Sequence, residues 1–441
     1  MNILKAAVLM ALLVSVLPVT RQATPFLFLG GSLLLLGRAG LVHAGNALLC
    51  LLLLKMAQGK RGRKLILYAG AALEAAFMLA MRSRVAGLSY TGLMLIGLLI
   101  EGAKTDVTAD PALLGAALYY PCLHLGPILS LPELRENLCR PERLTWARLA
   151  RGLHRICLGL FKKTVVADRL APLVDAVFSA PDAFCASAVR GTLLFYALAL
   201  YMDFSGAMDI VVGLSALVGI DLPENFRRPY LARSFGEYWR RWHITMGAWF
   251  RTYVFYPLAA CPVLMNCAAF GMRHAKGLCQ RRMASILMPL LLTWSLTGLW
   301  HGLSFHYLAW GLANGLLILL EAGLGERKRG PEWIGITFFV LLLIRVLFRA
   351  PSLCAAGCFY RCLLWGGGSG SIAAYLDGKD LFAVAAGTIL LGCREIREER
   401  GAGQPGPALC LCMSAALLFL SALFGVYGPG YSAAEFYYGR F

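Results

Sequence analysis

The sequence predicts an all-α protein that crosses a membrane many times. Of its 441 residues, 59% are hydrophobic and 15% are charged, whereas soluble domains carry about 25% charged residues. Apolar stretches recur along the whole chain, and a helix needs about 20 mostly apolar residues to span a bilayer. Lysine and arginine gather in short clusters between these stretches, which is typical of cytoplasmic loops.

The apolar stretches predict about ten to twelve membrane spans. We expect two short segments in each of 26–54 and 189–220, and one span in each of the others. The first stretch is expected to be retained, since no small-residue cleavage site follows it. A closed β-barrel is excluded because its strands would alternate apolar and polar residues. The stretches are 3–20, 26–54, 65–81, 85–100, 112–130, 189–220, 286–300, 307–320, 333–348, 381–392 and 408–426.

The net charge of +18 does not indicate nucleic-acid binding. The basic residues lie in loops between apolar segments, where anionic lipid headgroups attract them. We therefore expect the lipid bilayer, and no nucleic acid, as the partner of these charges. The fourteen cysteines include no C-x-x-C pair, so no metal site is expected. Without an internal repeat, residues 1–441 are expected to form a single membrane domain.

Residues 239–249 carry the densest aromatic cluster of the chain. Trp239, Trp242, Met246 and Trp249 recur at the spacing of one helix face, and His243 borders that face. Indole rings favour the depth of the lipid headgroups. The pattern predicts one amphipathic helix lying in the membrane interface.

Ionisable residues inside apolar stretches are costly, so a functional role is the default expectation for them. His301 stands out because it ends an uncharged run, 288–300. A neutral imidazole can accept a proton, and a positioned base contributes about 10²–10⁴-fold to a proton-transfer step. A hydrogen-bonded packing histidine is the alternative. The candidates are Glu74, Glu101, His124, Asp203, Asp209 and His301.

Several common catalytic motifs are missing from the sequence. It contains no G-x-S-x-G nucleophile elbow and no Walker A loop. No histidine is followed by aspartate at the H-x-x-x-D or H-x-x-x-x-D spacing of other acyltransferases. If the chain transfers acyl groups, a histidine base without a covalent serine intermediate is the simpler scheme.

Five blocks within about 85–365 resemble the membrane-bound O-acyltransferase family, in particular its alginate O-acetyltransferase and teichoic-acid D-alanyl transferase branch. The blocks are Y-P-C-L-H-L-G-P-I (120–128), G-L-F-K-K-T-V-V-A-D (159–168), Y-M-D-F-S-G (201–206) with P-E-N-F (223–226) and E-Y-W-R-R-W-H-I (237–244), T-W-S-L-T-G-L-W-H-G (293–302) with W-G (310–311), and F-R-A (348–350). The chain departs from the family at Thr252, where relatives carry an acid, and at Ser130, where they carry an arginine.

The resemblance implies a ring of about eleven transmembrane helices around a thin central funnel. It implies that His301 is the catalytic base and that His243 is the second signature histidine. Either His243 or a hydrogen-bond donor near it would stabilise the oxyanion that forms during acyl transfer. We expect Asp203, Trp300, Arg241 and Trp242 to bind or orient substrate; Asp203 as a packing carboxylate is the alternative.

The reaction implied by the resemblance is transfer of an acyl group from a thioester to a hydroxyl. The residues at 223–244 are more similar to the acetyltransferase branch, so we expect the group to be acetyl. The donor would be cytosolic acetyl-CoA or an acyl-carrier protein, with no bound cofactor. The acceptor would be a cell-surface polysaccharide or an extracytoplasmic esterase-like partner, and the protein a multi-pass protein of the plasma membrane. The alternatives are D-alanyl transfer to teichoic acid, acylation of a lipid, and a transporter lined by the histidines.

Overall fold

The computed structural model describes residues 30–31, 37–123, 125–325, 329–401, 403 and 405–427. Across these ranges the chain forms helices joined by loops, with two isolated β-bridges and no longer strand. The prediction of an all-α protein is confirmed. The predicted span 3–20, most of the first segment in 26–54, and the candidate His124 lie outside the described residues.

Six helices of the described chain are long and apolar enough to cross a membrane, or up to seven if the bent pair Ile244–Ala259 and Pro262–His274 is one span. This confirms a polytopic membrane protein, while ten to twelve spans stays a prediction. The six are α3 (Arg38–Ala57), α4 (Arg63–Met81), α11 (Ala186–Leu217), α16 (Leu278–His301), α17 (Phe305–Leu324) and α21 (Pro407–Phe424). Three further predicted stretches form α5 (Leu88–Lys104), α18 (Glu332–Arg349) and α20 (Gly378–Glu399).

Two apolar stretches fold differently from the prediction. Residues 189–217 of the predicted stretch 189–220 belong to one 32-residue helix, α11, instead of two short spans. No proline interrupts it, and 78% of its apolar window is buried inside the protein, so membrane thickness does not set its length. Residues 112–130 form the short helices α6 (Pro111–Ala117) and α7 (Tyr120–Leu123) and then non-helical chain. Pro121 and Pro127 cannot donate the backbone hydrogen bonds that would continue a helix.

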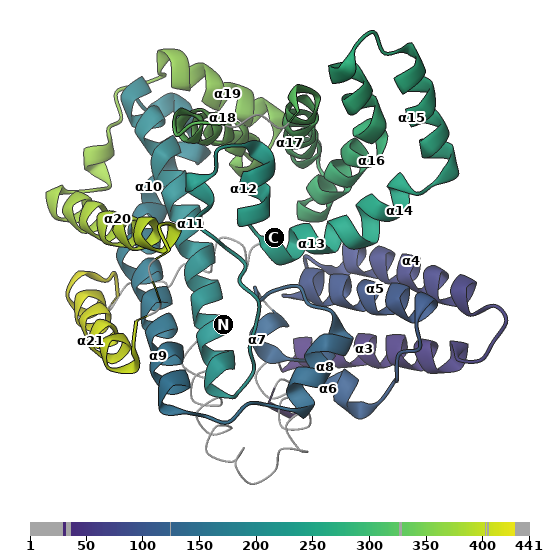
Figure 1. Ribbon diagram of the computed structural model, residues 1–441. Coiled ribbons are helices and arrows are strands. Elements are labelled where there is room, and N and C mark those ends of the chain that lie inside the picture. The colour runs from purple at the N-terminus through teal and green to yellow at the C-terminus, as the bar shows by residue number, and fades with distance from the viewer. Residues whose placement is uncertain are drawn as a thin grey trace.

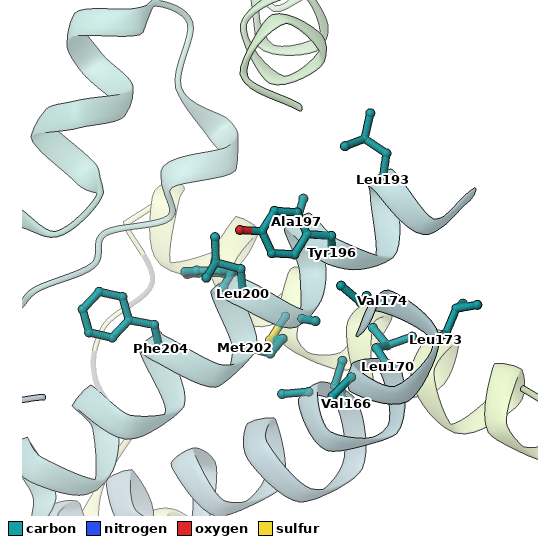
Figure 2. Close-up of a cluster of buried hydrophobic side chains, with 14 of the residues drawn as sticks. Val166, Leu170, Leu173, Val174, Leu193, Tyr196, Ala197, Leu200, Met202 and Phe204 are labelled. Carbon is teal, nitrogen blue, oxygen red and sulfur yellow. The ribbon is translucent and has the colours of Figure 1, made fainter. Parts of the chain in front are cut away.

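The buried apolar side chains form two cores. The first joins α9 (Trp146–Phe161), α10 (Asp168–Ser179) and α11 to α18, α19 (Leu353–Trp365) and α20. Figure 2 shows part of it, where Leu170 and Val174 of α10 cluster with Tyr196 and Leu200 of α11. The second core joins α3, α4 and α5 to α6, α7 and α8 (Leu131–Cys139).

Short helices lie between these two groups. They are α12 (Phe235–Arg241) and α13 (Ile244–Phe250), near the middle of Figure 1. From α13 the chain continues outward through α14 (Tyr256–Ala259) to α15 (Pro262–His274), which packs against α16. Tyr238 and Trp242 pack into the first core, whereas Met246 and Trp249 pack into the second. The chain therefore passes from one core to the other at His243.

Candidate active site

The helix predicted over 239–249 is broken at His243. Helix α12 ends before this residue and α13 begins after it, and His243 itself has φ 46° and ψ 53°. Such left-handed backbone is uncommon outside glycine, although histidine adopts it more readily than most residues. The prediction of one amphipathic helix in the interface is wrong, because Trp242 and Trp249 are buried within the protein.

A neighbouring loop holds this break in place. The backbone amide of Ile244 donates to the carbonyl of Asn225 at 3.0 Å, and that of Arg227 donates to the carbonyl of Arg241 at 2.9 Å. The side-chain oxygen of Asn225 accepts from the backbone N–H and the hydroxyl of Thr245, at 3.1 and 3.0 Å. These bonds satisfy backbone groups that lose their helical partners at the break.

The same asparagine fixes the tautomer of His243. Oδ1 of Asn225 lies 3.3 Å from Nδ1 of His243. Since Oδ1 also accepts the backbone N–H of Thr245, it is the amide oxygen, and His243 must donate from Nδ1. In the neutral ring, Nε2 is then the nitrogen that can accept a proton. This arrangement favours a proton-accepting role for His243 over donation to an oxyanion.

His301 is the last residue of α16 and is buried. Helices α16 and α17 approach closely through glycines. A Cβ on Gly298 would lie 2.3 Å from the carbonyl oxygen of Tyr307, and one on Gly311 would lie 2.2 Å from that of Trp294. Small residues permit such close contact between membrane helices. The contact fixes the end of α16 and therefore the position of His301.

The indole of Trp300 lies beside both histidine rings. Its centroid is 4.7 Å from that of His301 and 6.4 Å from that of His243. Tyr90 of α5 lies 5.9 Å from Trp300 and 6.4 Å from His243, and Phe204 of α11 lies 4.9 Å from His243. The structure thus brings together His243, His301 and Trp300, which the sequence predicted as site residues from two separate blocks.

An arginine from a distant loop caps the helix that carries His301. Arg82, directly after α4, donates from Nη1 to the carbonyl oxygen of Trp300 and, at 3.4 Å, to that of Leu299. The last carbonyls of a helix have no partner within it, and a cation there interacts favourably with the helix dipole. Arg82 therefore stabilises the last turn of α16.

A pocket adjoins His301. It is narrow, with a cavity volume of about 20 Å³, and it is partly open to the outside. Two of its lining residues, Trp310 and Phe348, have ring centroids 5.2 and 4.9 Å from that of His301. Its other polar or aromatic lining residues are Tyr238, Trp239, Trp242, Asn314 and Arg345.

The remaining predicted site residues lie in different surroundings. Trp242 lines the pocket. Arg241 pairs with Glu237 of its own helix at 2.6 Å and with Glu399 of α20 at 2.8 Å, and its hydrogen bond lowers the pKa of Glu399. The carboxylate of Asp203 accepts from the ammonium group of Lys163 at 2.7 Å. The substrate-binding or orienting roles of Arg241 and Asp203 stay predictions.

Three residues that shape this site were not singled out from the sequence. Asn225 lies in the P-E-N-F block, so the motif contained the signal, although nothing local links it to His243. Tyr90 lies in a mostly apolar helix, and Arg82 directly follows another, as basic residues that flank membrane helices often do. Their roles arise from contacts between segments far apart in the chain.

Residues 111–264 match the model of the membrane-bound O-acyltransferase family. The chain is 32% identical over 285 residues to Pseudomonas aeruginosa "Probable alginate O-acetylase AlgI" (63% of this chain, 51% of that protein). It is 31% identical over 247 residues to Helicobacter pylori "Peptidoglycan O-acetyltransferase" (53% and 43%). It is 28% identical over 256 residues to Bacillus subtilis "Teichoic acid D-alanyltransferase" (55% and 60%). The chain spans about half the length of the first of these relatives.

Proposed function

We propose that this protein, whose residues 111–264 match the model of the membrane-bound O-acyltransferase family, transfers an acyl group from a thioester to a hydroxyl group. The observation that carries the proposal is the arrangement of His243 and His301 about Trp300, beside a pocket lined by aromatic rings. Two buried imidazoles next to a pocket provide proton acceptors where a hydroxyl could be deprotonated.

In the proposed reaction His301 is the base. The acceptor oxygen attacks the thioester carbonyl carbon while His301 takes its proton, the carbon–sulfur bond breaks, and the thiolate leaves and is protonated. His243, held by Asn225 with Nε2 as the proton-accepting nitrogen, accepts a hydrogen bond from a second donor group of the acceptor and so orients the hydroxyl whose proton His301 takes. In this scheme Asp203 and Arg241 do not contact the reacting groups. They position the helices around the site, Asp203 through Lys163 and Arg241 through Glu399 of α20.

The proposed donor is acetyl-CoA or an acyl-carrier protein reaching the site from the cytosol. The acceptor is a hydroxyl of a cell-surface polysaccharide or of an extracytoplasmic partner, which places the protein in the plasma membrane. Support comes from the relatives, whose names refer to alginate, peptidoglycan and teichoic acid. The basic clusters between the apolar helices are proposed to face the cytoplasm.

Replacing His243 is expected to impair acyl transfer less than replacing His301. His243→Asn keeps a residue that tolerates left-handed backbone but removes the proton-accepting ring. We expect a loss of about 2- to 10-fold, the value of a hydrogen bond between neutral groups. Initial rates with purified protein and acetyl-CoA would measure it. A loss equal to that of His301→Gln in a folded protein would make the two histidines one catalytic unit, and unchanged rates would remove His243 from the mechanism.

The transferred group is expected to be acetyl rather than D-alanyl. The two acetyltransferase relatives are 32% and 31% identical, against 28% for the D-alanyltransferase. Mild alkali releases either ester from envelope polymers, and mass spectrometry would identify the released acid in wild-type and deletion strains. Acetate should fall to background in the deletion strain while D-alanine is unchanged. Loss of D-alanine with acetate unchanged would refute the acetyl assignment and leave the acyl-transfer chemistry in place.

A further inference from the structure

Two arginines of α9 bind the loop that carries Asn225. Arg155 donates from Nη1 and Nη2 to the two carboxylate oxygens of Glu224, at 2.8 and 2.9 Å. Seven residues earlier on the same helix, Arg148 donates to the two oxygens of Asp221, at 2.7 and 3.0 Å. Paired bonds of this kind fix the orientation of the two groups as well as their distance. Glu224 directly precedes Asn225, so the bonds from Arg155 hold the loop at the residue next to that asparagine.

The guanidinium of Arg155 is itself held in place by the helices around it. Its Nη2 lies 2.8 Å from Oδ1 of Asp209 on α11, and the other oxygen of Asp209 accepts from Lys162 at 2.8 Å. Helices α9 and α11 are in close backbone contact, because a Cβ on Gly159 would lie 2.4 Å from the carbonyl oxygen of Gly206. Arg155 therefore extends from a closely packed pair of helices and can fix the position of the loop relative to both.

The hydrogen bond from His243 to Asn225 depends on the exact position of the asparagine. The side chain is buried, and Nδ2 lies 3.3 Å from the sulfur of Met208 on α11. Oδ1 accepts from the backbone N–H and the hydroxyl of Thr245 at 3.1 and 3.0 Å, but lies 3.3 Å from Nδ1 of His243. The bond from the imidazole is the longest of the three, so a small displacement of Asn225 weakens it first. Without that bond, a neutral imidazole can carry its proton on either nitrogen.

We propose that Arg155 is a positioning residue for His243. Through its bonds to Glu224 it keeps Asn225 where the amide oxygen accepts from Nδ1. The proton of the imidazole then stays on Nδ1, and Nε2 stays the accepting nitrogen. The consequence for acyl transfer rests on the proposed function, whereas the position of the proton does not.

Glu224 is the residue to replace in a test, because Arg155 also contacts Asp209. An ion pair in which the carboxylate side chain is 39% exposed contributes little to stability, so Glu224→Ala should fold. Magnetic resonance of full-length protein in lipid nanodiscs, with ¹⁵N and ¹³C in its seven histidines, reports which ring nitrogen carries the proton. The signal of His243 is the one that His243→Asn removes. Wild type should carry this proton on Nδ1 alone, and Glu224→Ala should add a population that carries it on Nε2.

Rates of acyl transfer give a second readout of the same variant. Glu224→Ala should slow the reaction by at most about 2- to 10-fold, the loss expected for His243→Asn itself. In the His243→Asn background it should cost nothing further, because its effect passes through that ring. A change that merely loosened the fold would slow both backgrounds. The matched control is Glu398→Ala, which removes a 45% exposed partner of Arg394 within α20 and should change neither the rate nor the tautomer of His243.

Two further variants keep the inference testable if Glu224→Ala does not fold. Glu224→Gln keeps the shape but loses the charge, and Arg155→Lys keeps the charge but cannot form the paired bonds; each should shift part of the proton to Nε2. An unchanged Nδ1 tautomer in these folded variants, or a full additional loss in the His243→Asn background, would overturn the positioning role. Absence of acyl transfer in wild type would refute the proposed function instead, and the tautomer comparison would still decide whether Arg155 positions His243.

Discussion

Replacing His301 with glutamine is expected to reduce acyl transfer by about 10²–10⁴-fold, the contribution of a positioned general base. Glutamine fills most of the volume of the imidazole and can still form hydrogen bonds, but it cannot take a proton from the acceptor hydroxyl. The loss should therefore appear in the rate at saturating substrate, with little change in binding. Envelope acylation in a complemented deletion strain, normalised to the amount of protein in the membrane, would measure it.

Two controls distinguish a base from a packing residue at this position. His274 of α15 is exposed, and His274→Gln should leave activity unchanged. His301→Ala removes the ring from contacts with Trp300, Trp310 and Phe348, and should add a stability cost of a few kcal/mol to the chemical loss. Normal acylation by folded His301→Gln would show that His301 is not the general base. Disappearance of the protein from the membrane in both variants would favour the packing interpretation. Failure of purified wild type to consume acetyl-CoA would favour a transporter.

The class of the fold could be predicted because it depends on composition. Long apolar stretches require helices in a membrane, since every backbone polar group must be satisfied internally there. How each stretch divides into helices could not be predicted as well. Residues 189–220 and 112–130 have similar hydrophobicity, yet the first is a continuous helix and the second is broken near Pro121 and Pro127. Burial inside the protein allows the first to exceed the length of a membrane span, and the prolines interrupt the second. Hydrophobicity alone predicts neither outcome.

The histidines of the candidate site could be found from their motifs, whereas their environment could not. The aromatic residues around His243 follow a helical spacing, which predicts that His243 lies on a continuous helix. That spacing arises from two short helices that pack into different cores. The break is stabilised by Asn225, which is 18 residues away, and a local periodicity contains no information about such a partner.

Lys163→Met is expected to destabilise the folded protein by about 3–5 kcal/mol, because it removes a cation that contacts two buried carboxylates. The ammonium group of Lys163 lies 2.7 Å from Asp203 and 2.8 Å from Asp168, and these side chains are 8%, 0% and 4% exposed. Lys163 lies in a π-helical turn, η3 (Lys162–Ala167), between α9 and α10. Such turns are frequent at functional sites, and this one directs a lysine toward α11, the helix that also carries Phe204 beside His243.

The stability cost of Lys163→Met would be measured as a lower melting temperature and a smaller monodisperse fraction of the detergent-purified protein. The matched control is Asp106→Asn, which removes a partner of Arg63 that is 90% exposed and should cost at most about 1 kcal/mol. Adding Asp203→Asn to Lys163→Met should recover part of the loss, because one of the two carboxylates that Lys163 contacts is then neutral. If Lys163→Met melted like wild type, the pair would not support α11. If it lost activity without losing stability, Lys163 would act in the reaction and not in the scaffold.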